Sequence, residues 1–155
     1  MKTKPLIQGA VIASIYVVLT FIFAPISYGV MQVRISEALT ILPFFTPVAI
    51  PGLFIGCLVA NILGPYGLID MVFGSLATLL SAYLSYGLRK NSALVPLPPV
   101  IVNGIVIGGL LHFGYGVPVS LIGCILWVSL GQGISCYGLG YPLLNILRRY
   151  EKIFS

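Results

Sequence analysis

The chain is short of charge. Only 7% of its 155 residues are Asp, Glu, Lys or Arg, whereas a soluble domain carries about 25%. Hydrophobic residues make up 59%, and the mean hydropathy is +1.10. Because so few charges cannot cover a water-facing surface, the composition predicts a protein whose main solvent is the lipid bilayer. A membrane helix needs about 20 apolar residues, so the length allows about six spans in a single domain, residues 1–155.

Motifs of enzymes and nucleotide-binding proteins are also missing. The sequence has no glycine-rich phosphate loop ending in Gly-Lys-Ser/Thr, no His-Glu-x-x-His and no Gly-x-Ser-x-Gly. It has one histidine, and its three cysteines are isolated in apolar segments, so neither a metal site nor a disulfide framework is expected. We therefore expect no catalysis, no metal and no cofactor. If the protein is a transporter, its energy has to come from a gradient or from a partner.

The net charge of +5 comes from basic residues in three short clusters. They are Lys2 with Lys4, Arg89 with Lys90, and residues 148, 149 and 152. Such clusters between apolar runs are typical of residues that set membrane topology, because Lys and Arg accumulate on the cytoplasmic side. A nucleic-acid site would interleave basic and aromatic residues, so no nucleic acid is expected as a partner.

Charge-free intervals predict the membrane spans. Apolar runs cover residues 6–23, 52–63 and 68–88, and the uncharged interval 91–145 divides near residues 114–118. A further helix is expected over residues 34–42, and the prolines at 43, 47 and 51 interrupt the chain after it. Residues 24–33 are expected to form a loop.

The basic clusters decide the number of spans. If all three clusters are cytoplasmic, both termini are inside and an even number of spans precedes Arg89. Four spans then precede it, one of them short, and two follow. The sequence predicts an all-α, polytopic protein of six transmembrane helices in the cell membrane, with both termini cytoplasmic. A re-entrant segment at residues 34–51 is the alternative.

The remaining polar side chains collect in the outer third of this arrangement. Ionisable residues inside a membrane are costly, and they usually face a cavity or a partner. A polar pocket that opens outward is therefore favoured over residues dispersed in interfacial water, although Arg34 and Glu37 are also spaced to pair with each other. The candidate binding residues are Tyr28, Gln32, Arg34, Glu37, Asn61, Asp70, Asn103, His112, Trp127 and Gln132.

Small residues form a stripe near the start of the first span. Gly9 and Ala13, and beside them Ala10 and Ser14, are each spaced four apart. This spacing lets another helix approach closely. From the spacing alone, packing among the protein's own helices is the better explanation.

Residues 28–43, with their Arg-x-Ser-Glu-Ala-Leu-x-x-Leu-Pro stretch, resemble the signature of the QueT family. Residues 56–70 are similar to that family as well, and the likeness in length and helix pattern covers nearly the whole chain. The resemblance implies a substrate-binding S component of an energy-coupling factor (ECF) transporter, linked to queuosine precursors. Such a component binds its substrate from the outside and works with a transmembrane coupling protein and two ABC-type ATPase subunits.

The same resemblance implies roles for two segments. The first outer loop would act as a lid over the ligand, and the small residues Gly9, Ala10, Ala13 and Ser14 would contact the coupling protein, with a serine where the family pattern has a second alanine. A carboxylate such as Glu37 could accept hydrogen bonds from a deazaguanine base. Two alternatives stay open: an S component for another vitamin or purine-like compound, and a small oligomeric channel or structural membrane protein.

Overall fold

The computed structural model describes residues 2–29 and 31–155, and the regular structure within them is helical, without strands. The first half contains α1 (Thr3–Ile22), the single turn α2 (Ala24–Ser27), the 3₁₀ helix η1 (Ile35–Phe44), α3 (Ala49–Ile62) and α4 (Gly67–Gly87). The second half begins with α5 (Leu97–Gly109), which continues into the π-helical η2 (Leu110–Gly114). The last long helix consists of α6 (Leu121–Gly133), the π-helical η3 (Ile134–Gly140), α7 (Tyr141–Leu147) and the 3₁₀ segment η4 (Arg148–Ile153).

The all-helical class predicted from the sequence is confirmed. Among the described residues, four helical stretches are long and apolar enough to cross a membrane: Thr3–Ile22, Gly67–Gly87, Leu97–Gly114 and Leu121–Ile153. The helices η1 and α3 are apolar but shorter, with 10 and 14 residues. The number of six crossings therefore stays a prediction.

Two local expectations need correction. Residues 24–27 were expected in a loop but form the turn α2, because Pro25 lies in its first turn, where its missing N–H costs nothing. The helix expected over residues 34–42 forms as η1 in 3₁₀ geometry and reaches Phe44, with Pro43 inside it. Ten residues is long for a 3₁₀ helix, a geometry that often marks a strained or functional segment.

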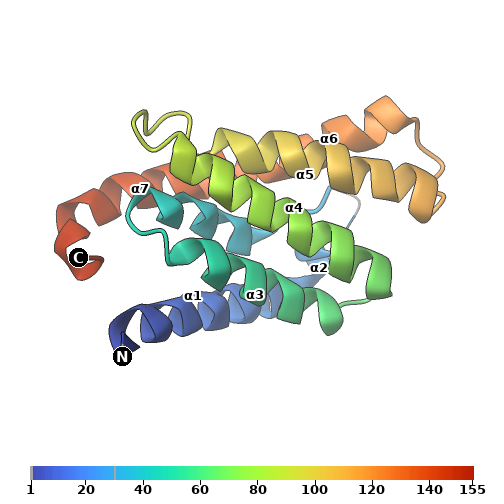
Figure 1. The fold of residues 1–155 in the computed structure, drawn as a ribbon. Coiled ribbons are helices and arrows are strands. Elements are labelled where there is room, and N and C mark those ends of the chain that lie inside the picture. The colour runs from blue at the N-terminus through green and yellow to red at the C-terminus, as the bar shows by residue number, and fades with distance from the viewer. Residues whose placement is uncertain (1, 30) are drawn as a thin grey trace.

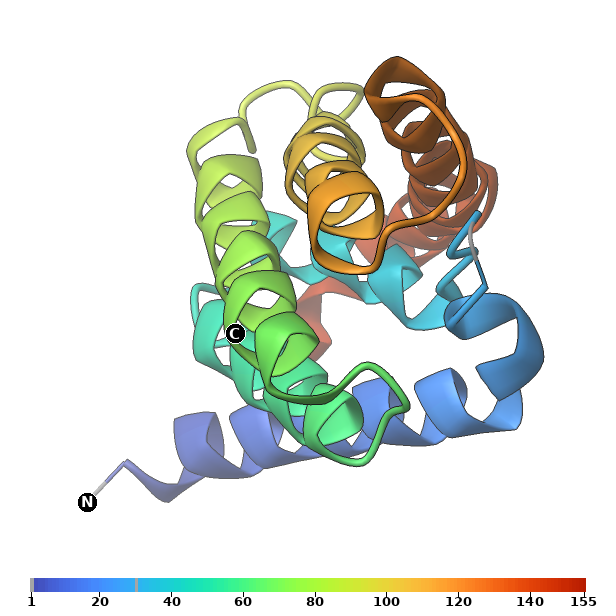
Figure 2. The same ribbon diagram turned by 90° about the vertical axis from the view of Figure 1, so that its right-hand side faces the viewer.

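The helix η1 lies in the middle of the protein. In sequence order α1 packs on α3, α3 on α4, α4 on α5 and α5 on α6, and η1 contacts α1, α4 and η3 from inside this ring (Figures 1 and 2). Its residues from Ser36 to Pro43 are all buried. A short polar-containing helix thus sits where a bundle normally has its apolar core.

The stripe of small residues on α1 is split between two environments. A Cβ atom added at Gly52 of α3 would stand 2.9 Å from the carbonyl oxygen of Gly9, and one at Gly56 would stand 3.0 Å from that of Ala13. Gly9 and Ala13 therefore let α3 approach closely, as the spacing alone suggested. Ala10 and Ser14 are exposed beside this contact.

Both chain ends lie at the same end of the helical body as the connection of residues 88–96 (Figure 1). The ammonium group of Lys4 donates to the carbonyl oxygen of Ser155, and Gln8 Nε2 donates to that of Ile153 at 3.4 Å. We call this the basic end, because it gathers the three clusters of Lys and Arg. The connections of residues 63–66 and 115–120 lie at the opposite end.

Apolar side chains cover the outside of the molecule, whereas many of the polar ones lie inside. Leu68 and Ile122, for example, are 73% and 70% exposed, while Arg34, Glu37 and Asp70 are buried. This polarity is the reverse of that of a soluble domain. It fits a body that is surrounded by lipid.

Candidate functional site

A buried ion pair joins η1 to α4. Arg34 Nη2 lies 3.2 Å from Asp70 Oδ2, and the two side chains are 3% and 2% exposed. Asp70 is in the first turn of α4, where a negative charge is favourable at the helix N-terminus. Arg34 Nε also donates to the carbonyl oxygen of Ser27 at 3.3 Å. The sequence left open whether Arg34 pairs with Glu37; the structure pairs it with Asp70 instead.

Glu37 is fully buried and is held by neutral groups from three other helices. The Tyr16 hydroxyl donates to its Oε1 from α1. Thr78 Oγ1 of α4 lies 3.4 Å from the same oxygen, and Asn103 Nδ2 of α5 lies 3.4 Å from Oε2. Within residues 2–29 and 31–155, no Lys or Arg stands at ion-pair distance from this carboxylate.

Cys57 connects the two carboxylate sites. Its Sγ lies 3.9 Å from Arg34 Nη1, 3.4 Å from Asn61 Nδ2 and 3.3 Å from Thr78 Oγ1. Since Thr78 also contacts Glu37, the ion pair and Glu37 belong to one network.

Two amides extend this network in opposite directions. Asn103 Nδ2 donates to Gln132 Oε1 at 3.1 Å, which reaches α6. Asn61 Nδ2 donates to the carbonyl oxygen of Asp70 at 3.1 Å, but its Oδ1 is buried without a hydrogen-bond partner. We call the whole network the buried polar cluster; it consists of Tyr16, Arg34, Glu37, Cys57, Asn61, Asp70, Thr78, Asn103 and Gln132.

Sequence reasoning missed three members of this cluster, namely Tyr16, Cys57 and Thr78. A clear signal existed for two of them. Tyr16 follows Ala13 by three residues on the side of α1 that faces α3, and Cys57 precedes Asn61 by four, so each shares a helix face with a residue already singled out. Thr78 has a weaker signal, because Ser75 and Ser81, three residues before and after it, share its face of α4.

Gln32 is buried next to the cluster in a strained backbone conformation. Its φ of 46° is in the left-handed region, which costs about 1–3 kcal/mol for a residue with a side chain. The backbone of this segment lies directly on α6, because a Cβ atom added at Gly131 would stand 1.9 Å from the carbonyl oxygen of Met31. Only glycine fits at position 131 without moving the segment.

Three tyrosines join the connections at the end opposite the basic end. Tyr115 donates to the carbonyl oxygen of Tyr66 at 3.1 Å, Tyr66 donates to that of Tyr28, and Tyr28 donates to that of Ala60 at 2.8 Å. The rings of Tyr66 and Tyr115 are 5.0 Å apart, and the Arg34 guanidinium carbon lies 5.5 Å from the centre of the Tyr28 ring. We call this chain the tyrosine clasp. It ties together the connections at the end where the sequence predicted that a polar pocket opens.

The Tyr66 hydroxyl gives a direct test of the clasp. Burial raises the pKa of Tyr66, so its hydroxyl keeps the proton that it donates. In Tyr66→Phe the bond to Tyr28 is lost, and since a hydrogen bond contributes about 1 kcal/mol net, we expect amide exchange of residues 31–34 to become about fivefold faster. Hydrogen-exchange mass spectrometry measures this rate. Tyr83→Phe, at an exposed position of α4, is the control, and equal exchange in both variants would contradict a closing role.

Two predicted binding residues lie apart from the cluster. His112 is half-buried, with Nδ1 2.9 Å from the carbonyl oxygen of Val119 in the following connection. Trp127 is 47% exposed and lines a shallow surface groove with Gly123, Leu126 and Leu130. The structure thus brings six of the ten candidates into the buried polar cluster, places Tyr28 and Gln32 beside it, and leaves His112 and Trp127 elsewhere.

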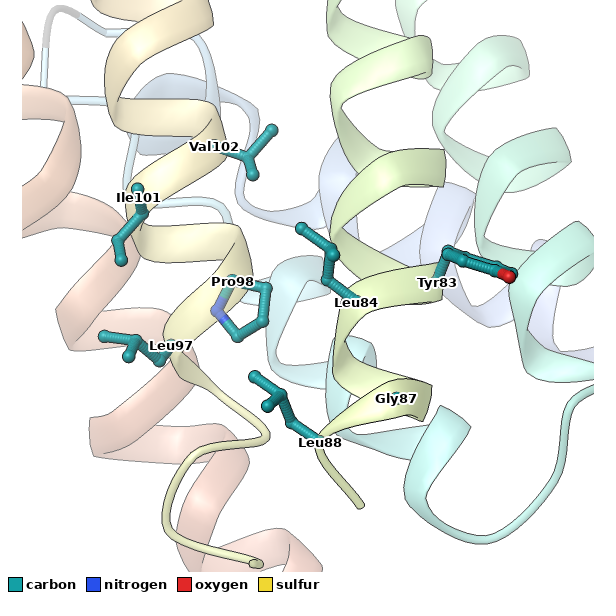
Figure 3. Close-up of a pocket in the computed structure, with 8 residues that line it drawn as sticks. All are labelled: Tyr83, Leu84, Gly87, Leu88, Leu97, Pro98, Ile101 and Val102. Carbon is teal, nitrogen blue, oxygen red and sulfur yellow. The ribbon is translucent and has the colours of Figure 1, made fainter. Parts of the chain in front are cut away.

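The groove between α4 and α5 has a different character (Figure 3). It is lined by Leu84, Leu88, Leu97, Pro98, Ile101 and Val102, and the Tyr83 side chain points away from α5. A site for a polar ligand needs convergent polar groups, which this lining does not offer. The groove fits contact with lipid chains.

Comparison with known proteins agrees with the resemblance. A family model described as "QueT transporter" matches residues 6–149. A curated relative, "Queuosine precursor transporter QueT" of Lactococcus lactis subsp. cremoris, is 38% identical over 88 residues, which are 56% of this chain and 50% of the relative. The match thus spans about half the length of that relative, and no solved structure gives a match. Because the family model covers nearly the whole chain, this protein belongs to the QueT transporter family.

Proposed function

We propose that the chain is the substrate-binding membrane subunit of an ECF-type importer, and that it binds a queuosine precursor, a 7-deazaguanine base, from the outside. Family membership supports a transporter, and the name of the curated relative supports the substrate. The observation that carries the proposal is the buried polar cluster, because two carboxylates, a guanidinium and three amides inside an apolar membrane body are costly and often mark a substrate pathway.

The cluster offers the chemistry that a deazaguanine base needs. Such a base presents N–H donors beside a carbonyl acceptor. An ionised carboxylate at Glu37 or Asp70 accepts only, whereas the amides of Asn61, Asn103 and Gln132 can donate or accept. Tyr28, in the clasp, offers an aromatic ring, and stacking of a base on an aromatic side chain is worth about 1–3 kcal/mol. Binding opens the clasp and places the base among these groups.

The orientation in the cell membrane follows from the charges. The basic end carries the three Lys and Arg clusters, so it faces the cytoplasm with both termini. The chain then crosses the bilayer six times as a single domain of residues 1–155, with η1 and α3 as the short second and third crossings. In this orientation the tyrosine clasp faces outward, toward the incoming substrate.

The coupling protein docks on α1 near the basic end. Gly9, Ala10 and Ala13 line a shallow apolar groove together with Val48 and Ile55. A smooth surface of this kind allows close contact with a helix of another membrane protein. The two ABC-type ATPase subunits act through this coupling protein, since the chain has no phosphate-binding loop of its own.

Ala10→Trp separates docking from binding. Ala10 is exposed beside the groove, so the indole blocks a partner without touching the buried polar cluster. We expect uptake by cells that contain the whole transporter to fall about tenfold or more, while ligand affinity of the purified protein stays within about twofold. Ile122→Trp, at an exposed position of α6, is the matched control with normal uptake. Equal uptake in Ala10→Trp and Ile122→Trp would show that α1 is not part of the docking surface.

The proposal itself is tested by isothermal titration of the purified protein with 7-deazaguanine bases. We expect micromolar or tighter binding by the lone chain, and transport only when the coupling protein and both ATPases are present. A folded sample without binding would contradict the proposal. If mass spectrometry identifies a different small molecule that co-purifies with the protein, the chain is still an S component, but its substrate is that molecule.

A further inference from the structure

The segment η4 surrounds a hollow in which positive charge is in excess. Its chain bends at Tyr150, whose φ of −118° and ψ of 25° are not helical. Around this bend lies a hollow of about 460 Å³, lined by Arg148, Arg149, Tyr150, Glu151, Lys152 and Ile153. Three of these side chains are cations and one is an anion, so the net charge around the hollow is three minus one, or +2.

The cations of the hollow are available to an anion from outside the chain. In the part of the chain that the structure describes, Arg148, Arg149 and Lys152 make no salt bridge, and all three are exposed. Arg148 is nevertheless held in place, because its guanidinium carbon lies 5.0 Å from the centre of the Phe44 ring. A guanidinium that is already fixed loses little freedom on binding, and its fork of N–H donors matches the oxygens of a phosphate group.

An apolar groove adjoins the hollow, and Ile153 lines both. The groove has a volume of about 190 Å³ and lies between η4 and α1, with the lining residues Ile7, Gln8, Val11, Ile12, Ile153 and Phe154. Gln8 donates to the carbonyl oxygen of Ile153 at 3.4 Å, and the ring of Phe154 stacks on that of Phe45 with their centres 4.9 Å apart. These contacts fix η4 against α1 and the end of η1. Because Ile7 is 61% exposed, the groove opens toward the lipid around α1.

We propose that the hollow and the groove together bind one anionic phospholipid. The phosphate group lies among Arg148, Arg149 and Lys152, and an acyl chain runs along the groove beside Ile7 and Val11. A positively charged hollow next to an apolar groove matches an amphiphile with a negative head. A free phosphate ion would leave the groove empty, and a lipid without net charge would gain little from the cations. The site belongs to the chain itself and does not depend on which substrate the protein carries.

A matched pair of lipids tests this site on the purified full chain. Phosphatidylglycerol and phosphatidylcholine with the same acyl chains differ in the head, and only the first has a net negative charge. Each basic residue near a membrane surface strengthens the binding of anionic lipid about fivefold, so the net charge of the hollow should give roughly 20-fold tighter binding of one phosphatidylglycerol. Native mass spectrometry of the protein in detergent, titrated with each lipid, counts the bound molecules.

Two results of this titration would overturn the proposal. One is equal binding of the two lipids. The other is equally tight binding of glycerol phosphate, which has the charged head but no acyl chain. Either result leaves the proposed transport of a queuosine precursor untouched, since no substrate takes part in the measurement.

Two double variants that remove equal charge assign the preference to the hollow. Arg149→Gln/Lys152→Gln brings the net charge of the hollow to zero, so the preference for phosphatidylglycerol should fall to within about twofold. Arg89→Gln/Lys90→Gln removes the same charge from another exposed cluster of the basic end and should keep the preference at roughly 20-fold. Equal losses in the two variants would show a general attraction to the basic end and would refute a lipid site in the hollow.

Two single variants separate the head of the lipid from its acyl chain. Glu151→Gln removes the carboxylate that lines the hollow, so phosphatidylglycerol should bind about fivefold more tightly while phosphatidylcholine is unchanged. Val11→Ser, at a position of α1 that is 50% exposed, makes the groove more polar and should weaken both lipids by the same factor. If Glu151→Gln binds phosphatidylglycerol no better than the wild type, the phosphate does not lie in the hollow. Unchanged lipid affinity in Val11→Ser would overturn the placement of the acyl chain.

Discussion

Arg34→Met is expected to destabilise the protein more than a change at any exposed basic residue. The variant leaves the Asp70 carboxylate buried without its partner and removes the donor to the carbonyl oxygen of Ser27. Breaking one side of a buried ion pair costs about 3–5 kcal/mol. For a chain of this size, that corresponds to a fall in Tm of roughly 10 °C. Thermal unfolding of the purified protein in detergent measures the change.

The double variant Arg34→Met/Asp70→Leu shows whether the stability lost in Arg34→Met comes from the unpaired Asp70 carboxylate or from the packing of the Arg34 side chain. Replacing both charges by apolar side chains removes the unpaired carboxylate, so most of the stability should return. Arg89→Met, at an exposed position, should shift stability by no more than about 0.5 kcal/mol. A double variant no more stable than Arg34→Met would show that the unpaired Asp70 is not the cause. Neither variant is expected to bind ligand as the wild type does, because Arg34 also orders the segment that carries Glu37.

Much of the fold could be predicted from the sequence because the bilayer limits the choice. An apolar run of about 20 residues has to be a helix there, since its backbone groups find no water. The run of residues 68–88 accordingly forms α4, Gly67–Gly87, and the run of residues 6–23 forms α1, Thr3–Ile22. The geometry of η1 could not be predicted in this way, because its 3₁₀ form depends on the helices that enclose it.

The position of the candidate residues along their helices could be predicted from the sequence, but the side of each helix that faces inward could not. Position along a span tells how deep a side chain lies, and this brought Arg34, Glu37 and Asp70 to one level. It does not tell which side of an almost uniformly apolar helix faces inward. The sequence placed Trp127 and Gln132 of α6 in one pocket, but in the structure Trp127 is at the surface and Gln132 is inside. Thr78 was missed although α4 does have an inward face of small and polar side chains, which includes Ser75, Thr78 and Ser81.

The strained backbone at Gln32, before η1, could not be predicted from the sequence either. Its contact with α6 leads to the second large predicted effect, that of Gly131→Ala. The added Cβ would stand 1.9 Å from the carbonyl oxygen of Met31 and 3.2 Å from the carbonyl carbon of Gln32. Both are backbone atoms, so no side-chain rotation can relieve the overlap. The segment has to lift from α6, and it carries Gln32 and Arg34 with it. Overpacking of this kind costs about 1–3 kcal/mol of stability, but the larger loss should be in ligand binding.

We expect Gly131→Ala to bind a 7-deazaguanine base about 10- to 100-fold more weakly, since ligand affinity falls by the fraction of molecules in which the segment keeps its native position on α6. Gly133→Ala is a matched control two residues along the same helix, where an added Cβ meets nothing within 4 Å. In the helix interior this control should gain about 0.5–1 kcal/mol, because alanine loses less conformational freedom than glycine. Titration and thermal unfolding of both variants measure the two effects. If Gly131→Ala binds ligand as tightly as Gly133→Ala, the contact between the Gln32 segment and α6 does not contribute to the binding site. The site is then confined to the side chains of the buried polar cluster.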